Sequence, residues 1–120
     1  MLQILGLLFA VASYAQEVTG TIGGRVLDAN GAAVVGAEVV ATHIETGGVR
    51  KVRTDGSGSY MIPAMRIGEY QLHASHPGFK KAIRNGLDLH ISDHLDIDLQ
   101  LQVGDMTQEV TVSALSLIHI

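Results

Sequence analysis

The residues best suited to chemistry in this sequence are two histidines, His90 and His94, which lie four positions apart in an aspartate-rich stretch. Imidazole and carboxylate groups bind divalent metal ions, and on a helix this spacing would place both imidazoles on one face. The surrounding residues alternate as in a strand, however, and Ser92–Asp93 is typical of a turn. The spacing therefore does not secure a metal site, and the polar surface of a hairpin is the simpler interpretation.

A second grouping contains the parts of a hydrolase triad. Ser57 and Ser59 lie close to Asp55, and His73 and His76 follow downstream. A nucleophilic serine in many hydrolases stands in a G-x-S-x-G turn, which this sequence lacks. Serine in a glycine-rich segment is more commonly a turn residue. We therefore predict no catalytic residue and no enzymatic activity.

Two aspartate segments, Asp28–Gly31 and Asp55–Gly58, have the composition of the start of a calcium-binding loop. In that loop the twelfth residue is a glutamate that contacts the ion through both carboxylate oxygens. Counting twelve residues from Asp28 reaches Val39, and counting from Asp55 reaches Arg66. Both segments are therefore interpreted as turns, and the sequence predicts neither a metal ion nor another cofactor.

The elements that position these residues are predicted to be short strands. Apolar and polar residues alternate most regularly in Leu95–Gln102, and no comparable stretch follows the helical period. Turn residues separate the runs at about 8–12 residues, and Arg84–Gly86 is expected to be one such turn. The expected strands are Thr21–Leu27, Ala37–His43, Val49–Thr54, Tyr60–Ile62, Tyr70–Ser75, Leu87–Ile91 and Leu95–Gln102. This pattern predicts an all-β domain, and specifically a β-sandwich.

Length and composition limit the class of protein. The chain has 120 residues, which is room for one domain, and it has no cysteine, so the domain must fold on its core alone. Its formal net charge is −4, and its lysines and arginines form no continuous stripe. A nucleic-acid partner is therefore not expected.

The two ends differ from the middle of the chain. Met1–Ala12 is almost wholly apolar, and Ser13–Ala15 is the small-x-small pattern of a signal-peptide cleavage site. We expect a signal peptide at residues 1–15, the β-sandwich at residues 16–103 and an exit segment at residues 104–120. Within that segment, Glu109–Ala114 is either a last strand or an extended exit. The apolar end indicates a truncated chain.

Five motifs in order resemble the carboxypeptidase regulatory-like domain family. The family pattern is G-x-V-x-D-x-x-G, x-x-G-A-x-V, T-D-x-x-G-x-Y, G-x-Y and P-G-F, and the resemblance extends from about Thr19 to Leu101. The matching segments are Gly24–Gly31, Val34–Val39, Thr54–Tyr60, Gly68–Tyr70 and Pro77–Phe79. The resemblance implies a seven-stranded, transthyretin-like Greek-key sandwich.

The matching residues have expected structural roles. Glycines of the motifs stand where turns need a positive φ or a close backbone approach. Asp28 and Asp55 are placed to accept backbone N–H bonds within their turns. The three aromatic residues of the motifs, Tyr60, Tyr70 and Phe79, are expected to supply most of the aromatic core. The predicted turn and core motif consists of Gly31, Gly36, Asp55, Gly58, Tyr60, Gly68, Tyr70 and Phe79.

The flanks are similar to one subgroup, the Oar-like TonB-dependent outer-membrane receptors. In these, a signal peptide precedes the domain, and a segment similar to Val103–Ala114 leads into a plug and then a barrel. The resemblance implies a non-catalytic accessory domain on the periplasmic side of the outer membrane of a Gram-negative-type bacterium. Its expected partners are the missing plug and barrel of the same full-length chain, through which alone it would reach the membrane. Periplasmic proteins of the energy-coupling system are further expected partners.

Two other functions stay open at this point. The first is a carbohydrate- or protein-binding module of a secreted or surface protein, since related sandwiches bind glycans. Sugar sites usually stack aromatic side chains, and three tyrosines and two phenylalanines leave little aromatic surface for that. The second is the regulatory domain of a metallocarboxypeptidase, in which the zinc-binding domain would come first. A signal peptide directly before the domain argues against that order.

Overall fold

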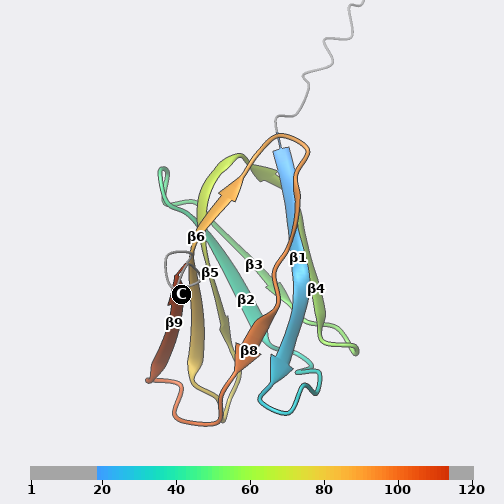
Figure 1. Ribbon diagram of the computed structural model, residues 1–120, viewed down its shortest axis with the longest axis vertical. Coiled ribbons are helices and arrows are strands. Elements are labelled where there is room, and N and C mark those ends of the chain that lie inside the picture. Colours follow the sequence, from blue (N-terminus) through green and yellow to red (C-terminus); the bar gives the residue numbers. More distant parts are fainter. Residues whose placement is uncertain (1–18, 114–120) are drawn as a thin grey trace, which may run out of the picture.

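The computed structural model describes residues 19–113, which form nine strands and no helix (Figure 1). The all-β prediction is confirmed, although nine strands replace the expected seven. Within the described residues, no helix is long and apolar enough to cross a membrane. The strands are β1 (Thr19–Asp28), β2 (Glu38–His43), β3 (Val49–Arg53), β4 (Ser59–Arg66), β5 (Gly68–Ser75), β6 (Lys81–Leu89), β7 (His94–Asp96), β8 (Leu99–Leu101) and β9 (Glu109–Ser113).

The strands form two sheets that pack as a sandwich. In the first sheet β1 is central: β4 pairs with it antiparallel, and β7 and β8 pair with it in parallel. The second sheet has five strands in the order β3-β2-β5-β6-β9. Because β3 and β4 each end a sheet and follow one another in the chain, their free edges lie next to each other (Figure 1).

The expected single strand Leu95–Gln102 is divided into β7 and β8. Its register against β1 is the same on both sides of the break, since Gly23 pairs with Asp96 and Val26 with Leu99. At the break, the Arg25 N–H donates to the Asp98 side chain at 3.0 Å and not to a backbone carbonyl. A side chain that replaces the backbone acceptor interrupts the ladder, and this break accounts for one of the two additional strands.

The expected turn at Arg84–Gly86 is wrong, because β6 runs through it without a break. Tyr70 pairs with Leu87 and Leu72 pairs with Arg84, so two residues of β6 lie opposite Gln71 alone. This is a β-bulge, and Gly86 has the positive φ of 74° that such a bulge can require. The Asn85 side chain accepts a hydrogen bond from Gln71 Nε2 at 2.6 Å. The Asn-Gly pair therefore bends a strand where the sequence pattern indicated a reversal.

The core lies between the sheets and is built from alternate strand residues. Tyr60 and Tyr70 are buried, with 5% and 3% of their surface exposed. Phe79, in the turn after β5, is half-buried and packs against the edge of the core. It therefore contributes less than expected. The largest fully buried side chains are Ile22, Val26, Val39, Ile62, Met65, Leu72, Leu89 and Leu101.

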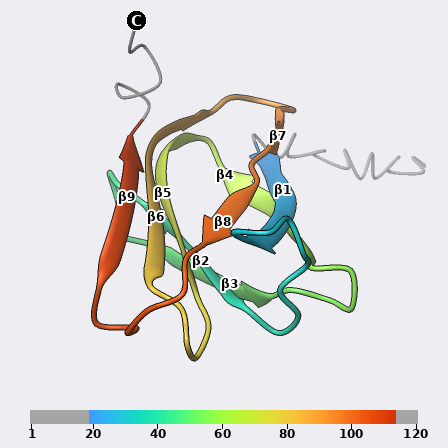
Figure 2. The same ribbon diagram turned by 60° about the horizontal axis from the view of Figure 1, so that its bottom comes forward.

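The segment Glu109–Ser113 is a strand and not a loose exit. It forms β9, which lies in parallel beside β6 at the edge of the five-stranded sheet (Figure 2). Lys81 and Glu109 stand opposite each other at the start of this pairing. The predicted signal peptide and the apolar end lie outside the described residues, and the predicted domain boundaries stay predictions.

Candidate functional site

Two places in residues 19–113 combine polar side chains with a turn or a groove and are the candidates for function. The first is the set of turns where β1 ends and β4 begins, which contains most of the predicted glycine and aspartate motif. The second is a groove between β3 and β4. The hydrogen bonds of each place show which polar atoms are already occupied and which could meet a ligand.

Asp28 and Asp55 begin two turns of matching geometry. In each, the aspartate Oδ1 accepts hydrogen bonds from the backbone N–H groups two and four residues later, at 2.9–3.0 Å. The glycine three residues later donates its N–H to the aspartate carbonyl at 3.0 Å. These glycines, Gly31 and Gly58, have φ values of +81° and +74°. Both carboxylates are thus used to close their own turns, as an Asx turn does.

Thr54 connects these turns to the start of β2. The side chain is buried, with 5% exposed. Its Oγ1 accepts from the Ala37 N–H at 2.9 Å and donates to the Val34 carbonyl at 2.6 Å. This role of Thr54 was not predicted from the sequence, although Thr54 is the threonine of the T-D family motif, and that was the available signal. A buried hydroxyl with both roles occupied is a structural cross-link.

Replacing Thr54 with valine is expected to destabilise the domain by about 1–3 kcal/mol. Valine keeps the shape of the side chain but leaves the Ala37 N–H and the Val34 carbonyl without their partner. Urea denaturation of Thr54→Val measures the loss, and Thr54→Ser, which keeps the hydroxyl, is the control and should lose less. Equal midpoints for the valine variant and the unmodified chain would show that the cross-link contributes nothing.

Asp55 should make stability depend on acidity. The Ser57 hydroxyl, and then the N–H groups of Ser57 and Ser59, lower the pKa of the Asp55 carboxyl. A pKa that is lower in the folded state stabilises the fold above the unfolded-state value, and this stabilisation is lost as the pH falls through the folded-state value. As the pH is lowered past about 4, we therefore expect the melting temperature to decrease. The decrease should be smaller in Asp55→Asn. Because Asp55 is exposed, low salt shows the difference best. Parallel pH profiles would contradict this role.

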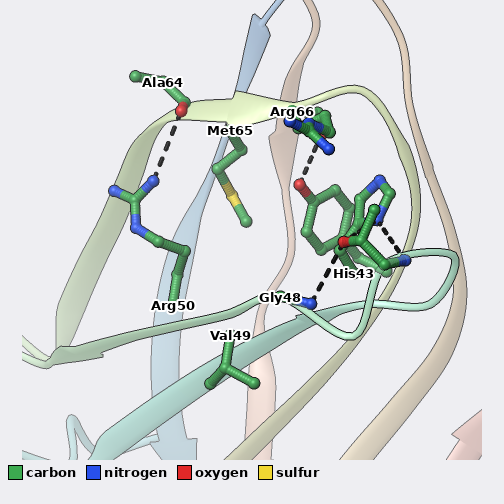
Figure 3. Close-up of a pocket in the computed structure, with 9 residues that line it drawn as sticks. His43, Gly48, Val49, Arg50, Ala64, Met65 and Arg66 are labelled. Carbon is green, nitrogen blue, oxygen red and sulfur yellow. Dashed lines mark hydrogen bonds between the residues drawn. The ribbon is translucent and has the colours of Figure 1, made fainter.

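His43 and Tyr70 both line the second place, the groove, and Figure 3 shows where His43 lies. His43 is buried, with 3% exposed, and its Nε2 lies 2.9 Å from the Ile67 carbonyl. Its Nδ1 accepts from the Thr46 N–H at 3.2 Å, so Nε2 carries the proton and donates it. The two rings meet edge to face, with centroids 5.0 Å apart, and the Tyr70 hydroxyl donates to the Arg66 carbonyl. No role for His43 was predicted from the sequence, although its position in the alternating strand Ala37–His43 was a signal that its side chain could be buried.

The walls of the groove carry two arginines. Arg50 extends from β3 to β4, where its Nη2 donates to the Pro63 carbonyl at 3.2 Å and its Nη1 lies 3.5 Å from the Ala64 carbonyl (Figure 3). Arg66 stands on the opposite wall, and the lining, which falls wholly within residues 19–113, includes no aspartate or glutamate. The groove has a volume of about 380 Å³. It is therefore a positively charged depression across the gap between the two sheets.

The structure separates the other predicted motif residues. The Tyr60 hydroxyl donates to the Ile97 carbonyl at 2.5 Å, and burial raises its pKa. Gly68 lies against the His43 ring, and Gly36 has a φ of +74° in the turn before β2. Phe79 meets His76 edge to face, with centroids 5.8 Å apart. These residues hold different parts of the sandwich and do not form one site.

The chemical groupings considered from sequence are not assembled. His90 and His94 flank a tight turn in which the Asp93 carboxylate accepts from the His90 N–H. Among residues 19–113, no three histidine, aspartate or glutamate side chains gather as a metal site would require. Ser57 bonds to Asp55 and Ser59, and no hydrogen bond in this range joins either serine to a histidine.

Comparisons with known proteins identify a matching family and a relative. Residues 21–102 match the carboxypeptidase regulatory-like domain family. The TonB-dependent transporter Oar of Myxococcus xanthus is 33% identical over 97 residues, which are 80% of this chain but only 9% of that protein.

Two solved structures have a similar fold. Hydroxyquinol 1,2-dioxygenase from Pseudomonas putida DLL-E4 superposes with a TM-score of 0.60 at 13% identity, over 72% of this chain and 57% of that one. The Bacillus anthracis TIE protein superposes with a TM-score of 0.61 at 13% identity, over 72% of this chain and 17% of that one. At these identities the likeness shows the sandwich fold alone.

Proposed function

The chain belongs to the carboxypeptidase regulatory-like domain family, and we propose from this that it is a non-catalytic accessory domain of a TonB-dependent outer-membrane transporter. The observation that carries the proposal is the 33% identity to the transporter Oar across 80% of the chain. That similarity extends over most of the sandwich, so it reaches well beyond the short turn motifs.

The hydrogen bonds of the polar residues support a structural and not a catalytic role. Polar side chains in both places are committed to backbone groups: Asp55 closes its turn, Thr54 links two segments and His43 bonds through both ring nitrogens. A nucleophile would need a free base within hydrogen-bond reach. The domain would therefore contribute by contact with other parts of a transporter.

In this proposal the domain lies on the periplasmic side of the outer membrane, joined to a plug and a barrel of the same full-length chain. It would modulate energy coupling or contact periplasmic proteins of that system. Because the matched residues are 9% of the Oar sequence, the remaining parts are assigned by analogy with that protein.

Protease protection of the native gene product tests the location. A short epitope and cleavage site can be inserted at the exposed turn Met106–Thr107, which connects β8 to β9 without burying side chains. We expect the site to be protected in intact cells and cut once the outer membrane is permeabilised. Cutting in intact cells would place the domain at the cell surface, and protection after permeabilisation would place it in the cytoplasm; either result contradicts the proposal. Sequencing of the gene beyond codon 120 should show plug and barrel segments.

A further inference from the structure

We propose that the groove between β3 and β4 binds a short extended peptide that carries a carboxylate side chain. The groove has a volume of about 380 Å³, within the range of ligand sites in proteins. Its walls present Arg50 and Arg66 (Figure 3), and the mostly buried Tyr70 is also among its lining residues. The inference rests on this geometry and is independent of the transporter role proposed above.

The charge of the groove determines the kind of group that it would bind. Arg50 and Arg66 are the charged residues of the lining. Burial raises the pKa of the Tyr70 hydroxyl, and Arg50 and Arg66 offset part of that effect, so both guanidinium groups lie close enough to act on it. Two nitrogens of the Arg50 guanidinium, Nη1 and Nη2, donate hydrogen bonds to carbonyls of β4. A guanidinium has five N–H donors, so further donors stay available. A carboxylate is the complementary group for the donors that are left.

The edge of β3 supplies the backbone partners of an extended peptide. The His43 N–H donates to the Gly48 carbonyl, and the Thr54 N–H donates to the Ala37 carbonyl. Hydrogen-bonded positions alternate along an antiparallel pair, so the backbone groups of Val49 and Lys51 point away from β2. Since β3 is the last strand of its sheet, these groups are placed to pair with an added strand.

The other wall favours β3 as the pairing strand. β4 carries Pro63, which has no N–H to donate, and Arg50 already occupies the Pro63 and Ala64 carbonyls. Side chains alternate between the two faces of a strand. In a peptide strand added to β3, an acidic side chain that points to Arg50 is therefore flanked by two residues whose side chains point outward, on the same face as Val49. Val49 is 51% exposed and Ile44, in the preceding turn, is also 51% exposed. An apolar–acidic–apolar sequence therefore fits best.

Nuclear magnetic resonance titration of the ¹⁵N-labelled 120-residue chain tests this inference. The probe is acetyl-Val-Glu-Val-amide, and the comparison probes are acetyl-Val-Gln-Val-amide and acetate. We expect saturable shifts of the amides of residues 48–51 and 65–67 by the glutamate peptide, with affinity about fivefold weaker for the glutamine peptide. Arg50→Gln and Arg66→Gln should each weaken the glutamate peptide by about the same factor.

Arg53→Gln is the matched control, because Arg53 lies on the same strand but extends to Gly36 and Glu38, away from the groove. It should leave the affinity unchanged. Arg66→Gln keeps the test valid if Arg50→Gln disturbs β4, since no hydrogen bond of the Arg66 side chain is found within residues 19–113. Equal binding of both peptides, equal shifts with acetate, or no saturation up to about 10 mM would overturn the proposal.

Discussion

Replacing Gly24 with alanine is expected to destabilise the domain by about 4 kcal/mol or more, a large part of the stability of a domain this size. A Cβ at this position would lie 2.0 Å from the Ile97 carbonyl oxygen and 2.6 Å from the carbonyl carbon. Both atoms belong to the backbone, so no side-chain rotation relieves the clash. Gly24 also has a φ of +150°, which residues with a side chain rarely adopt.

The effect of Gly24→Ala has a defined structural route. The Ile97 N–H donates to the Gly23 carbonyl at 2.7 Å, in the segment that joins β7 to β8. Moving Ile97 away from β1 would lengthen that bond and displace the acceptor of the Tyr60 hydroxyl. Thermal unfolding followed by circular dichroism measures the loss, and hydrogen exchange should show early opening of residues 94–101.

Gly31→Ala is the control for Gly24→Ala. Gly31 has a positive φ of 81°, but no atom lies within 4 Å of the position that a Cβ would take, so only the backbone conformation is penalised. We expect a loss of about 1–2 kcal/mol, or roughly 4–16 °C in melting temperature. A Gly24→Ala variant that melts no lower than Gly31→Ala would show that β7 and β8 can move away from β1 at little cost.

Replacing Tyr70 with alanine is expected to cost about 3–5 kcal/mol. The ring is 3% exposed and packs against His43, so its removal leaves a cavity beneath the groove. It also removes the donor to the Arg66 carbonyl, which holds the turn between β4 and β5. The melting temperature of the variant, measured by calorimetry or circular dichroism, reports the combined loss.

Tyr70→Phe separates the two contributions. Phenylalanine keeps the ring and loses only the hydroxyl, so the expected cost is about 0.5–1.5 kcal/mol. If Tyr70→Ala and Tyr70→Phe destabilise equally, the hydrogen bond and not the packing holds this residue. An unchanged midpoint for Tyr70→Ala would remove Tyr70 from the core altogether.

The turn motifs were predictable because their contacts are local. In Asp28–Gly31 and Asp55–Gly58 the carboxylate bonds to N–H groups two and four residues away, and the glycine follows in the same segment. Neighbours in sequence are neighbours in space in such a turn, so residue types and spacing are enough. By contrast, Asn85–Gly86 carries a turn signal but forms a bulge, because pairing with β5 holds β6 extended through it.

The candidate groove could not be predicted, because its parts come from distant segments. His43 bonds to Ile67 and Arg50 bonds to Pro63, across 24 and 13 residues of sequence. Nothing in the local pattern of either residue names its partner. The alternation in Ala37–His43 identified the strand, but only the pairing of β2 with β5 places the His43 ring against Tyr70.

Residue patterns were enough to predict the all-β class, the family motifs and the burial of alternate residues in Leu95–Gln102, since these follow from local turn chemistry and the two-residue period of strands. The partner of each strand, in contrast, is known only from the folded chain. Parallel pairing of β7 and β8 with β1 brings residues 73 positions apart together, as in the bond from Arg25 to Asp98. Gly24 shows the reason: its need to be glycine arises from the Ile97 backbone, a neighbour that exists only after folding.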